Sequence, residues 1–462
     1  MKRLWIVLFL LISLSCNLFS RVGESFSPTS TSTPSAVPTS TPSPIPPTPV
    51  VYIPPDCQGQ PVATLVPETT TAKPTPELAA NPPITKKEQL HVLDELASKV
   101  NEVYLYPDFN GVNWADITAE YRTRVENGLD TEAFYTGLEN LIFELGDDHS
   151  QFQSPAMVEQ SDAELSGSND FVGIGMVALP LPEKGRVTVL SVFPDSPAEH
   201  GGLTQHDSIL AVDGIPIVQD GVAHTERVRG PECSAVVLTV QSPGEEPRDI
   251  TFIRMRISAS LPIVARLVPT SDGSRIGYIY LPTFFDETIQ GQVKQALEDF
   301  GPLDGLILDN RMNGGGSSDV VEPILSYFAE GTLGHFISRK GERPLTVTAD
   351  PVNNSQTVPL IVLVGEDTIS FGEIFSGALQ DTSRAKVIGQ ATLGNVEILD
   401  GYTFSDGSRI WVAEERFDPI VSHADWEKTG IIPDVTAHAD WDTFTFKTDP
   451  AIAAALALWG KN

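Results

Sequence analysis

Three patterns of apolar and polar residues follow one another along this chain. From residue 84 to residue 160, apolar residues recur every three or four positions, which predicts a small N-terminal helical region. Between residues 165 and 258, short β-type runs are separated by Gly, Pro and Asp turns, which predicts a compact β-rich domain. The clearest of these runs are Arg186–Val192, Ser208–Val212 and Ala235–Val240.

From residue 262 to residue 440, buried strand patterns alternate with helical patterns. The predicted elements are, in order, Ile276–Leu281, Thr288–Phe300, Gly305–Asp309, a helix from Asp319, and Leu360–Val364. Alternating β and α units predict an α/β domain. Residues 441–462 are expected to form a C-terminal helical segment.

The first residues predict export. Met1, Lys2 and Arg3 precede an apolar run that is too short for a permanent membrane span, so residues 1–15 form an expected signal peptide. The residues just before Cys16 fit a small-x-small cleavage pattern and resemble the lipobox of bacterial lipoproteins, which implies a lipid anchor on Cys16. Because Ser13 stands where Leu is usual, an ordinary secreted protein is the alternative.

Residues 16–83 are dominated by Pro, Ser and Thr, with almost nothing to bury. This composition predicts a semi-extended tether. Cys57 lies within it and Cys233 lies in the β-rich domain. In an oxidising compartment these two cysteines could form a disulfide, and the sequence leaves that pairing open.

Charge excludes some partners. The chain has 30 Lys and Arg against 61 Asp and Glu, a formal net charge of −31, which disfavours nucleic acid. No Cys pair and no His-x-x-x-His spacing of metal-ligand type is present, so we expect no metal, and no cofactor is implied. Membrane contact is expected only through the lipid anchor.

The β-rich segment carries a recognisable series of motifs. In order, they are Phe171–Met176, Pro194–Leu203, Asp207–Gly214 and Val228–Gly230. Together they resemble a PDZ domain, which implies that Gly173, Ile174, Gly175 and Met176 form its carboxylate-binding turn. Glycines let neighbouring N–H groups converge on a carboxylate, while a strand edge pairs with the peptide. The alternative is a PDZ module used only as a spacer or lid.

A buried strand, a short turn and a helix at residues 361–381 place Ser370 at a helix N-terminus. Unpaired N–H groups and the positive end of the helix dipole would stabilise an oxyanion formed there. Nucleophilic serines often occupy such turns, although serine is also a common helix cap.

Four motifs then give Ser370 a context. They are Leu145–Ser150, Leu308–Gly316, Ile369–Ile374 and Gly430–Asp434. With the PDZ pattern, they resemble the carboxyl-terminal processing, or tail-specific, serine proteases over about residues 88–435. The resemblance implies a ClpP/crotonase-like α/β protease core with an inserted PDZ domain. It also implies that Ser370 is the nucleophile and that the N–H groups of Phe371 and Gly315 form the oxyanion hole, a role that a glycine-rich strand end suits.

One motif departs from this family. Most members use a Ser-Lys dyad with the lysine in Thr-Phe-Gly-Lys-Gly, but here the lysine position is Asn395. An amide cannot take up a proton at neutral pH. Asn395 could instead contact the oxyanion or the substrate backbone, or be an ordinary turn residue. Lys386 and Lys428 are nearby, but neither occupies the motif position.

A histidine can replace the lysine. The tricorn-core relatives of this family activate the serine with a histidine and complete the site with a glutamate, and His149 and Glu427 match these positions. An imidazole suits a general base at neutral pH, and a nearby carboxylate would orient it and raise its pKa. Asp148 stands where those relatives carry serine, so Asp147 or Asp148 could do the orienting instead. The alternative for His149 is a structural role.

We therefore predict an exported, extracytoplasmic serine endopeptidase that cleaves unstructured polypeptides, recognised through their C-termini, by acyl-enzyme chemistry. The competing hypothesis is a catalytically inactive family member that binds peptides or apolar ligands at the cell surface. Joint retention of Ser370, His149 and the glycine loop favours the peptidase.

Overall fold

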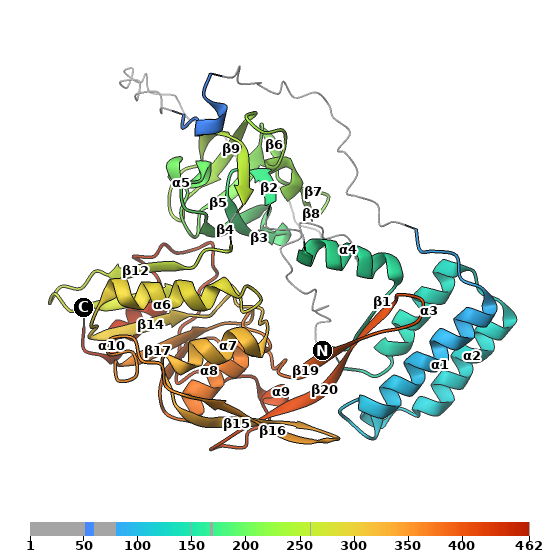
Figure 1. Ribbon diagram of the computed structural model, residues 1–462. Coiled ribbons are helices and arrows are strands. Elements are labelled where there is room, and N and C mark those ends of the chain that lie inside the picture. Colours follow the sequence, from blue (N-terminus) through green and yellow to red (C-terminus); the bar gives the residue numbers. More distant parts are fainter. Residues whose placement is uncertain (1–50, 60–79, 148, 167–169, 259, 462) are drawn as a thin grey trace, which may run out of the picture. The chain divides into compact units, whose positions relative to one another are not determined.

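The computed structural model describes residues 51–59, 80–147, 149–166, 170–258 and 260–461. The described chain forms two compact units, one from residues 80–170 and 258–461 and the other from residues 51–59 and 171–257 (Figure 1). The predicted signal peptide at 1–15 and Cys16 lie outside the described residues. No helix among the described residues is long and apolar enough to cross a membrane.

The first unit begins with the predicted helices. They are α1 (Lys86–Val103), α2 (Trp114–Asn127) and α3 (Thr131–Phe143). Each begins at a side-chain cap: Thr85 forms a capping box with Glu88, and Asn113 and Asp130 accept from backbone N–H groups of the first turns. Their apolar faces share one buried core, as the periodicity predicts.

A six-stranded sheet forms the centre of the same unit. Its strands are, in spatial order, β12 (Val264–Val268), β13 (Ile276–Tyr280), β14 (Gly305–Asp309), β17 (Leu360–Val364), β18 (Lys386–Gly389) and β21 (Val435–Thr436). From β13 to β21 the strands are parallel, and β12 is antiparallel at the edge. The helices α6 (Thr288–Phe300), α7 (Ser318–Ser326) and α8 (Phe371–Asp381) share its main apolar core.

A second sheet joins the helical region to this core, and the sequence did not predict it. It runs β1 (Gln151–Gln153), β20 (Arg409–Pro419), β15 (Gly331–Ser338) and β16 (Gly341–Val347), with β19 (Ile398–Thr403) also on β20. The predicted helical region therefore contains one strand, β1, and continues into α4 (Pro155–Ser166). β1 has only three residues, too few to show a two-residue alternation.

The C-terminal segment is fixed by buried charges. It contains α10 (Pro450–Leu458), whose cap Asp449 accepts from two backbone N–H groups and forms an ion pair with Arg311. Arg311 also binds Asp309 at the end of β14. Burial alone would lower the pKa of Arg311, but the two carboxylates hold it well above its usual range. This cluster anchors the loop that follows β14.

The second unit is β-rich, as predicted. Its main sheet runs β10 (Arg248–Ile253), β9 (Ala235–Gln241), β5 (Ser208–Val212), β4 (Arg186–Val192) and β3 (Met176–Leu181), with β6 (Ile215–Pro216) on β5. The short pairs are β2 (Asp170–Gly173) with β11 (Met255–Ser258), and β7 (Val218–Gln219) with β8 (Val222–Ala223). The single turn of helix α5 (Pro197–His200) packs on β10.

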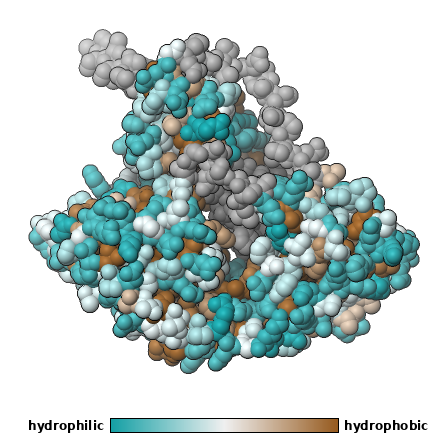
Figure 2. Space-filling view, viewed as in Figure 1, coloured by the Kyte–Doolittle hydropathy of each residue, from teal (hydrophilic) through white to brown (hydrophobic). Residues whose placement is uncertain are grey.

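Part of the predicted tether belongs to this second unit. Cys57 forms a disulfide with Cys233, with a Cα–Cα distance of 5.3 Å, which settles the pairing that the sequence left open. Tyr52 also stacks on His200, with ring centroids 3.7 Å apart. The tether prediction is therefore wrong for residues 51–59, because a covalent bond holds a segment with little apolar surface of its own. Figure 2 shows mostly hydrophilic residues on the visible described surface, in accord with the net charge of −31.

Candidate active site

Ser370 occupies a strained turn between β17 and α8. Its φ of 56° and ψ of −124° are rare for a residue with a side chain, and such strain persists only where the surroundings fix the backbone. Two contacts fix it: the Ile369 N–H donates to the Asn313 carbonyl (3.0 Å) and the Ser370 N–H to the Asn395 carbonyl (2.8 Å). The sequence-predicted position at a helix N-terminus is confirmed, and residues Phe371–Leu379 of the helix are buried.

Glu373 ties this turn to the loop that carries Asn395. Its buried carboxylate accepts hydrogen bonds from the Thr392 hydroxyl (2.6 Å) and from the N–H groups of Gly394 (3.0 Å), Asn395 (2.9 Å) and Ser370 (3.2 Å). Burial raises its pKa to about 7, although these donors act in the opposite direction. The four donors fix the position where the family resemblance places a lysine.

The glycine loop that follows β14 lies against Ser370. A Cβ on Gly315, whose φ is +99°, would stand 2.8 Å from the Cβ of Ser370, so only glycine fits. Its N–H, however, donates to Oδ1 of Asn313 (2.9 Å) and is already committed. The Phe371 N–H takes part in none of the hydrogen bonds found among the described residues. Of the two predicted oxyanion donors, the structure therefore leaves Phe371 available.

His149 and Glu427 meet, as predicted from the tricorn-like pattern. The Nε2 atom of His149 lies 3.6 Å from Oε1 of Glu427, and His149 is 7% exposed. The other oxygen of Glu427 accepts from the Val396 N–H (2.9 Å). Since Asn395 contacts Ser370 and Val396 contacts Glu427, these two adjacent residues connect Ser370 to the carboxylate that faces His149.

The backbone around His149 is held from two sides. Its N–H donates to Asp147 (3.0 Å), and the Ser150 hydroxyl accepts from Ala413 of β20 (3.0 Å). Burial lowers the pKa of the imidazole, but the carboxylates of Glu427, Glu397 and Asp147 together raise it by more than burial lowers it. The net shift of the pKa is therefore upward. Asp147 thus orients the backbone rather than the ring nitrogen facing Glu427. Asp148 lies outside the described residues.

Sequence reasoning missed Glu397 and Tyr106. Glu397 is 2% exposed and accepts a hydrogen bond from the Tyr106 hydroxyl. Burial, and then the charge of Glu427, raise its pKa to about 7. His149, Glu397 and Glu427 each place a potential metal-ligand atom within 4.8 Å of the others. The available signal was a lone carboxylate between the apolar residues Val396 and Ile398.

With this geometry in view, the comparisons identify the family. The model of peptidase family S41 matches residues 275–437, and that of the tricorn protease C1 domain matches residues 85–142. A carboxyl-terminal-processing protease of Synechocystis sp. is 31% identical over 359 residues, covering 76% of this chain and 82% of the relative. One from Picosynechococcus sp. is 30% identical over 341 residues, covering 72% and 80%.

The chain belongs to the S41 family of carboxyl-terminal processing proteases. It is a serine-type peptidase. Among solved structures, the photosystem II D1 C-terminal processing protease has the same fold, with a TM-score of 0.52 and 24% identity over 80% of this chain and 96% of that one. The expected S41 fold, a mixed α/β architecture with several sheets, is confirmed.

The two lysines considered as substitutes for the missing base are engaged elsewhere in this S41 peptidase. Nζ of Lys386 pairs with Oδ1 of Asp434 (2.7 Å), and Lys428 pairs with Asp425 on the surface. Lys428 and Glu427 both lie on the single turn α9 (Trp426–Thr429), but Lys428 is exposed. Asn395 contributes its backbone N–H and carbonyl to the contacts around Ser370.

The predicted carboxylate-binding turn of the second unit lies between β2 and β3. Gly173 ends β2 and Met176 begins β3, so Ile174 and Gly175 form the connection. A Cβ on Gly175, whose φ is +83°, would lie 2.3 Å from the Cβ of Ser196, which explains the glycine. β3 is the last strand in the spatial order of its sheet.

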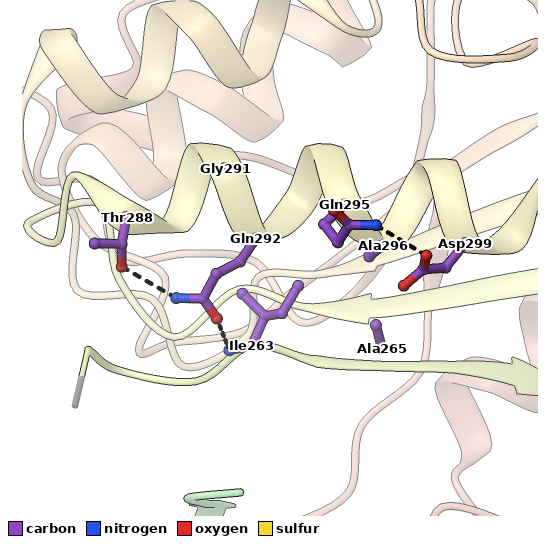
Figure 3. A pocket seen from close by; sticks show the side chains of 8 residues that line it. All are labelled: Ile263, Ala265, Thr288, Gly291, Gln292, Gln295, Ala296 and Asp299. Atoms are coloured by element: carbon purple, nitrogen blue, oxygen red, sulfur yellow. Dashed lines mark hydrogen bonds between the residues drawn. The ribbon is translucent and has the colours of Figure 1, made fainter.

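The residues that line a shallow hollow on the first unit include neither Ser370 nor His149 (Figure 3). It lies between α6 and the edge strand β12, and Gln292 spans it by bonding the Ile263 N–H and the Thr288 hydroxyl. β13 and β14 separate this edge from β17, which leads to Ser370. The hollow therefore belongs to a different part of the sheet from Ser370.

Proposed function

We propose that the chain cleaves unstructured polypeptides outside the cytoplasm by acyl-enzyme chemistry on Ser370, with His149 as general base. His149 takes the proton of the Ser370 hydroxyl as Oγ attacks the peptide carbonyl carbon. The Phe371 N–H, at the positive end of α8, stabilises the oxyanion. Collapse of the tetrahedral intermediate breaks the C–N bond, the protonated imidazole gives its proton to the leaving amine, and water then hydrolyses the ester.

The observation that carries this proposal is the Asn395–Val396 connection. One of these residues holds the Ser370 backbone and the next holds Glu427, whose other oxygen faces His149. Glu427 orients the imidazole and favours its protonated form, which a general base requires. Nε2 of His149 makes no hydrogen bond to the described residues, and hydrogen bonds between catalytic groups commonly tighten only when substrate binds.

We also propose that the second unit is a PDZ domain inserted in a ClpP/crotonase-like core, and that it binds substrate C-termini. The turn Gly173–Met176 would hold the terminal carboxylate, and the outer edge of β3, the last strand of this sheet among the described residues, would pair with the peptide backbone. The expected signal at 1–15 and lipidation of Cys16 would place the peptidase at the cell surface, attached through the part of the tether that precedes residue 51.

The test of the catalytic proposal is cleavage of an unstructured polypeptide by the chain from Cys16 onward, which keeps Cys57 for its disulfide. Ser370→Ala and His149→Ala should each lower kcat/KM by roughly 10³-fold or more, because both take part in the proton transfer. His423→Ala is the matched control, since His423 also faces a carboxylate, Asp418 at 3.0 Å, but is exposed. It should retain full activity.

Two results would contradict the proposal. Full activity of His149→Ala would remove the histidine from the mechanism. Absence of turnover in every form, with peptide binding retained, would favour the inactive peptide-binding protein instead.

For the PDZ proposal, a peptide with a free C-terminal carboxylate should bind at least about ten times more tightly than its amidated form, because the amide loses the charge that the N–H groups of the turn recognise. Equal affinity would exclude that role.

A further inference from the structure

The group formed by His149, Glu397 and Glu427 has an unusual set of free ligand atoms. Tyr106 donates to Oε1 of Glu397, and the Val396 N–H donates to Oε2 of Glu427. The other oxygen of Glu397 and the Nε2 of His149 are buried and make no hydrogen bond to the described residues. Each carboxylate is therefore held by one donor at one oxygen, and a second oxygen remains for another partner.

Leaving such atoms unsatisfied is costly. A buried polar atom without a partner costs about 1–3 kcal/mol, and native proteins contain few of them. Here two lie in one group whose third member is another carboxylate. A bound cation would satisfy all three residues at once and would offset the repulsion between the two carboxylates.

The distances fit a small transition-metal ion. Nε2 of His149 and Oε1 of Glu427 are 3.6 Å apart, which is too long for a hydrogen bond. It is close to the separation of about 3.4 Å expected between two ligand atoms that each lie about 2.1 Å from a tetrahedral zinc ion. Glu397, within 4.8 Å of both, would complete the site after a small side-chain rotation. An imidazole nitrogen with two carboxylates favours zinc-like ions over Mg²⁺ or Ca²⁺.

We propose that His149, Glu397 and Glu427 bind a divalent transition-metal ion, and that this ion inhibits peptide hydrolysis by occupying His149. Tyr106 and the Val396 N–H orient the two carboxylates from outside, as partners of metal ligands commonly do. The three residues come from separate segments, which is why local ligand spacing led us to expect no metal. The inhibitory half of this inference rests on the proposed role of His149 as base.

Inhibition follows from the chemistry of imidazole. A neutral imidazole has one nitrogen with a free lone pair, and the other nitrogen carries a proton. If Nε2 of His149 donates its lone pair to the metal, Nδ1 keeps its proton and cannot accept another from Ser370. The ring can thus bind the metal or serve as general base, but it cannot do both.

Binding is tested without activity, by calorimetric titration of Zn²⁺ into the Ser370→Ala chain. We expect one saturable site, weakened at least tenfold by an added Glu397→Gln, because a ligand is lost, and about tenfold by an added Tyr106→Phe, because the ligand loses its orienting partner. An added Glu298→Gln, which removes an exposed glutamate of α6, should leave the site unchanged. Thermal unfolding of each variant reports whether it folds. Zn²⁺ affinity in the Glu397→Gln and Tyr106→Phe variants equal to that of the Ser370→Ala chain alone would overturn the assignment.

Inhibition is tested on the active chain. Zn²⁺ should lower the cleavage rate at the concentrations that fill the site, and chelation should restore it. Each variant is compared with its own zinc-free rate, and Glu397→Gln should need at least tenfold more Zn²⁺. Zinc binding without an effect on the rate would overturn the inhibitory half. Zinc binding by a chain with no peptidase activity would support the metal site while contradicting the proposed function, so the two failures are distinguishable.

Discussion

Glu373 and Glu397 are two buried glutamates of one site, and they differ in how their carboxylates are satisfied. Burial raises the pKa of each to about 7. Among the described residues, Glu373 accepts four hydrogen bonds, whereas Glu397 accepts one and its other oxygen has no hydrogen-bond partner. A similar pKa shift can therefore accompany opposite roles. A carboxylate whose two oxygens both accept hydrogen bonds, as in Glu373, positions the donors around it. A carboxylate with one oxygen left unbonded, as in Glu397, can bind a further ligand.

The largest expected effect is the loss of stability in Glu373→Ala. Three donors, the Thr392 hydroxyl and the N–H groups of Gly394 and Asn395, would lose their acceptor in a buried region, so the free energy of unfolding should fall by about 3 kcal/mol or more. The Ser370 N–H keeps its hydrogen bond to the Asn395 carbonyl. Glu397→Ala removes the acceptor of only the Tyr106 hydroxyl and also removes a repulsive charge. Its free energy of unfolding should therefore change by no more than about 1 kcal/mol. Urea unfolding of both variants measures the difference. Equal losses of stability in the two variants would show that the number of hydrogen bonds accepted does not separate Glu373 from Glu397.

A smaller effect is expected in the pH dependence of stability. The folded pKa of Glu373 lies near 7, above its ordinary value of about 4.5, so the folded chain binds more protons between these pH values. The stability that this group contributes is present below about pH 4.5 and is lost as the pH rises through about 7. Glu373→Gln should remove this loss, which amounts to at most about 1.4 kcal/mol per pH unit.

Unfolding free energies at pH 5, 6, 7 and 8 measure this slope. The exposed Glu298→Gln, with the same change of charge, should keep the slope of the original chain. Glu397 has a pKa raised to a similar value, so part of the slope should persist in Glu373→Gln. A constant difference between Glu373→Gln and the original chain at every pH would show that Glu373 does not titrate in this range.

The sequence predicted the secondary structure around Ser370 well because its signals are local. β14, β17 and α6 have the predicted bounds, since continuous apolar runs and a helical period both lie within a dozen residues. Ser370 follows from the strand, turn and helix in which it stands. The strain at its backbone could not be predicted, because it depends on contacts with Asn313 and Asn395.

The group formed by His149, Glu397 and Glu427 could not be predicted from local sequence patterns, because its residues are far apart in the chain. His149 and Glu427 were found only through a resemblance, and Glu397 and Tyr106 were missed, because these residues come from segments far apart in the chain that meet only in the folded structure. The half-exposed strands β15 and β16 of that sheet show no clear apolar run. Contacts between segments far apart in the chain leave no periodic pattern in the sequence.

The smallest expected effect concerns Asn395, which occupies the lysine position next to both glutamates. Its backbone N–H donates to Glu373, and its carbonyl accepts from Ser370. Asn395→Ala keeps both bonds, so kcat/KM should fall less than about tenfold. Asn395→Pro removes the N–H, so kcat/KM should fall further, because the hydrogen bond from residue 395 to the Glu373 carboxylate is lost. If Asn395→Ala instead lost activity as completely as Ser370→Ala, the amide side chain would be part of the chemistry, and the site would depend on more than its backbone at this position.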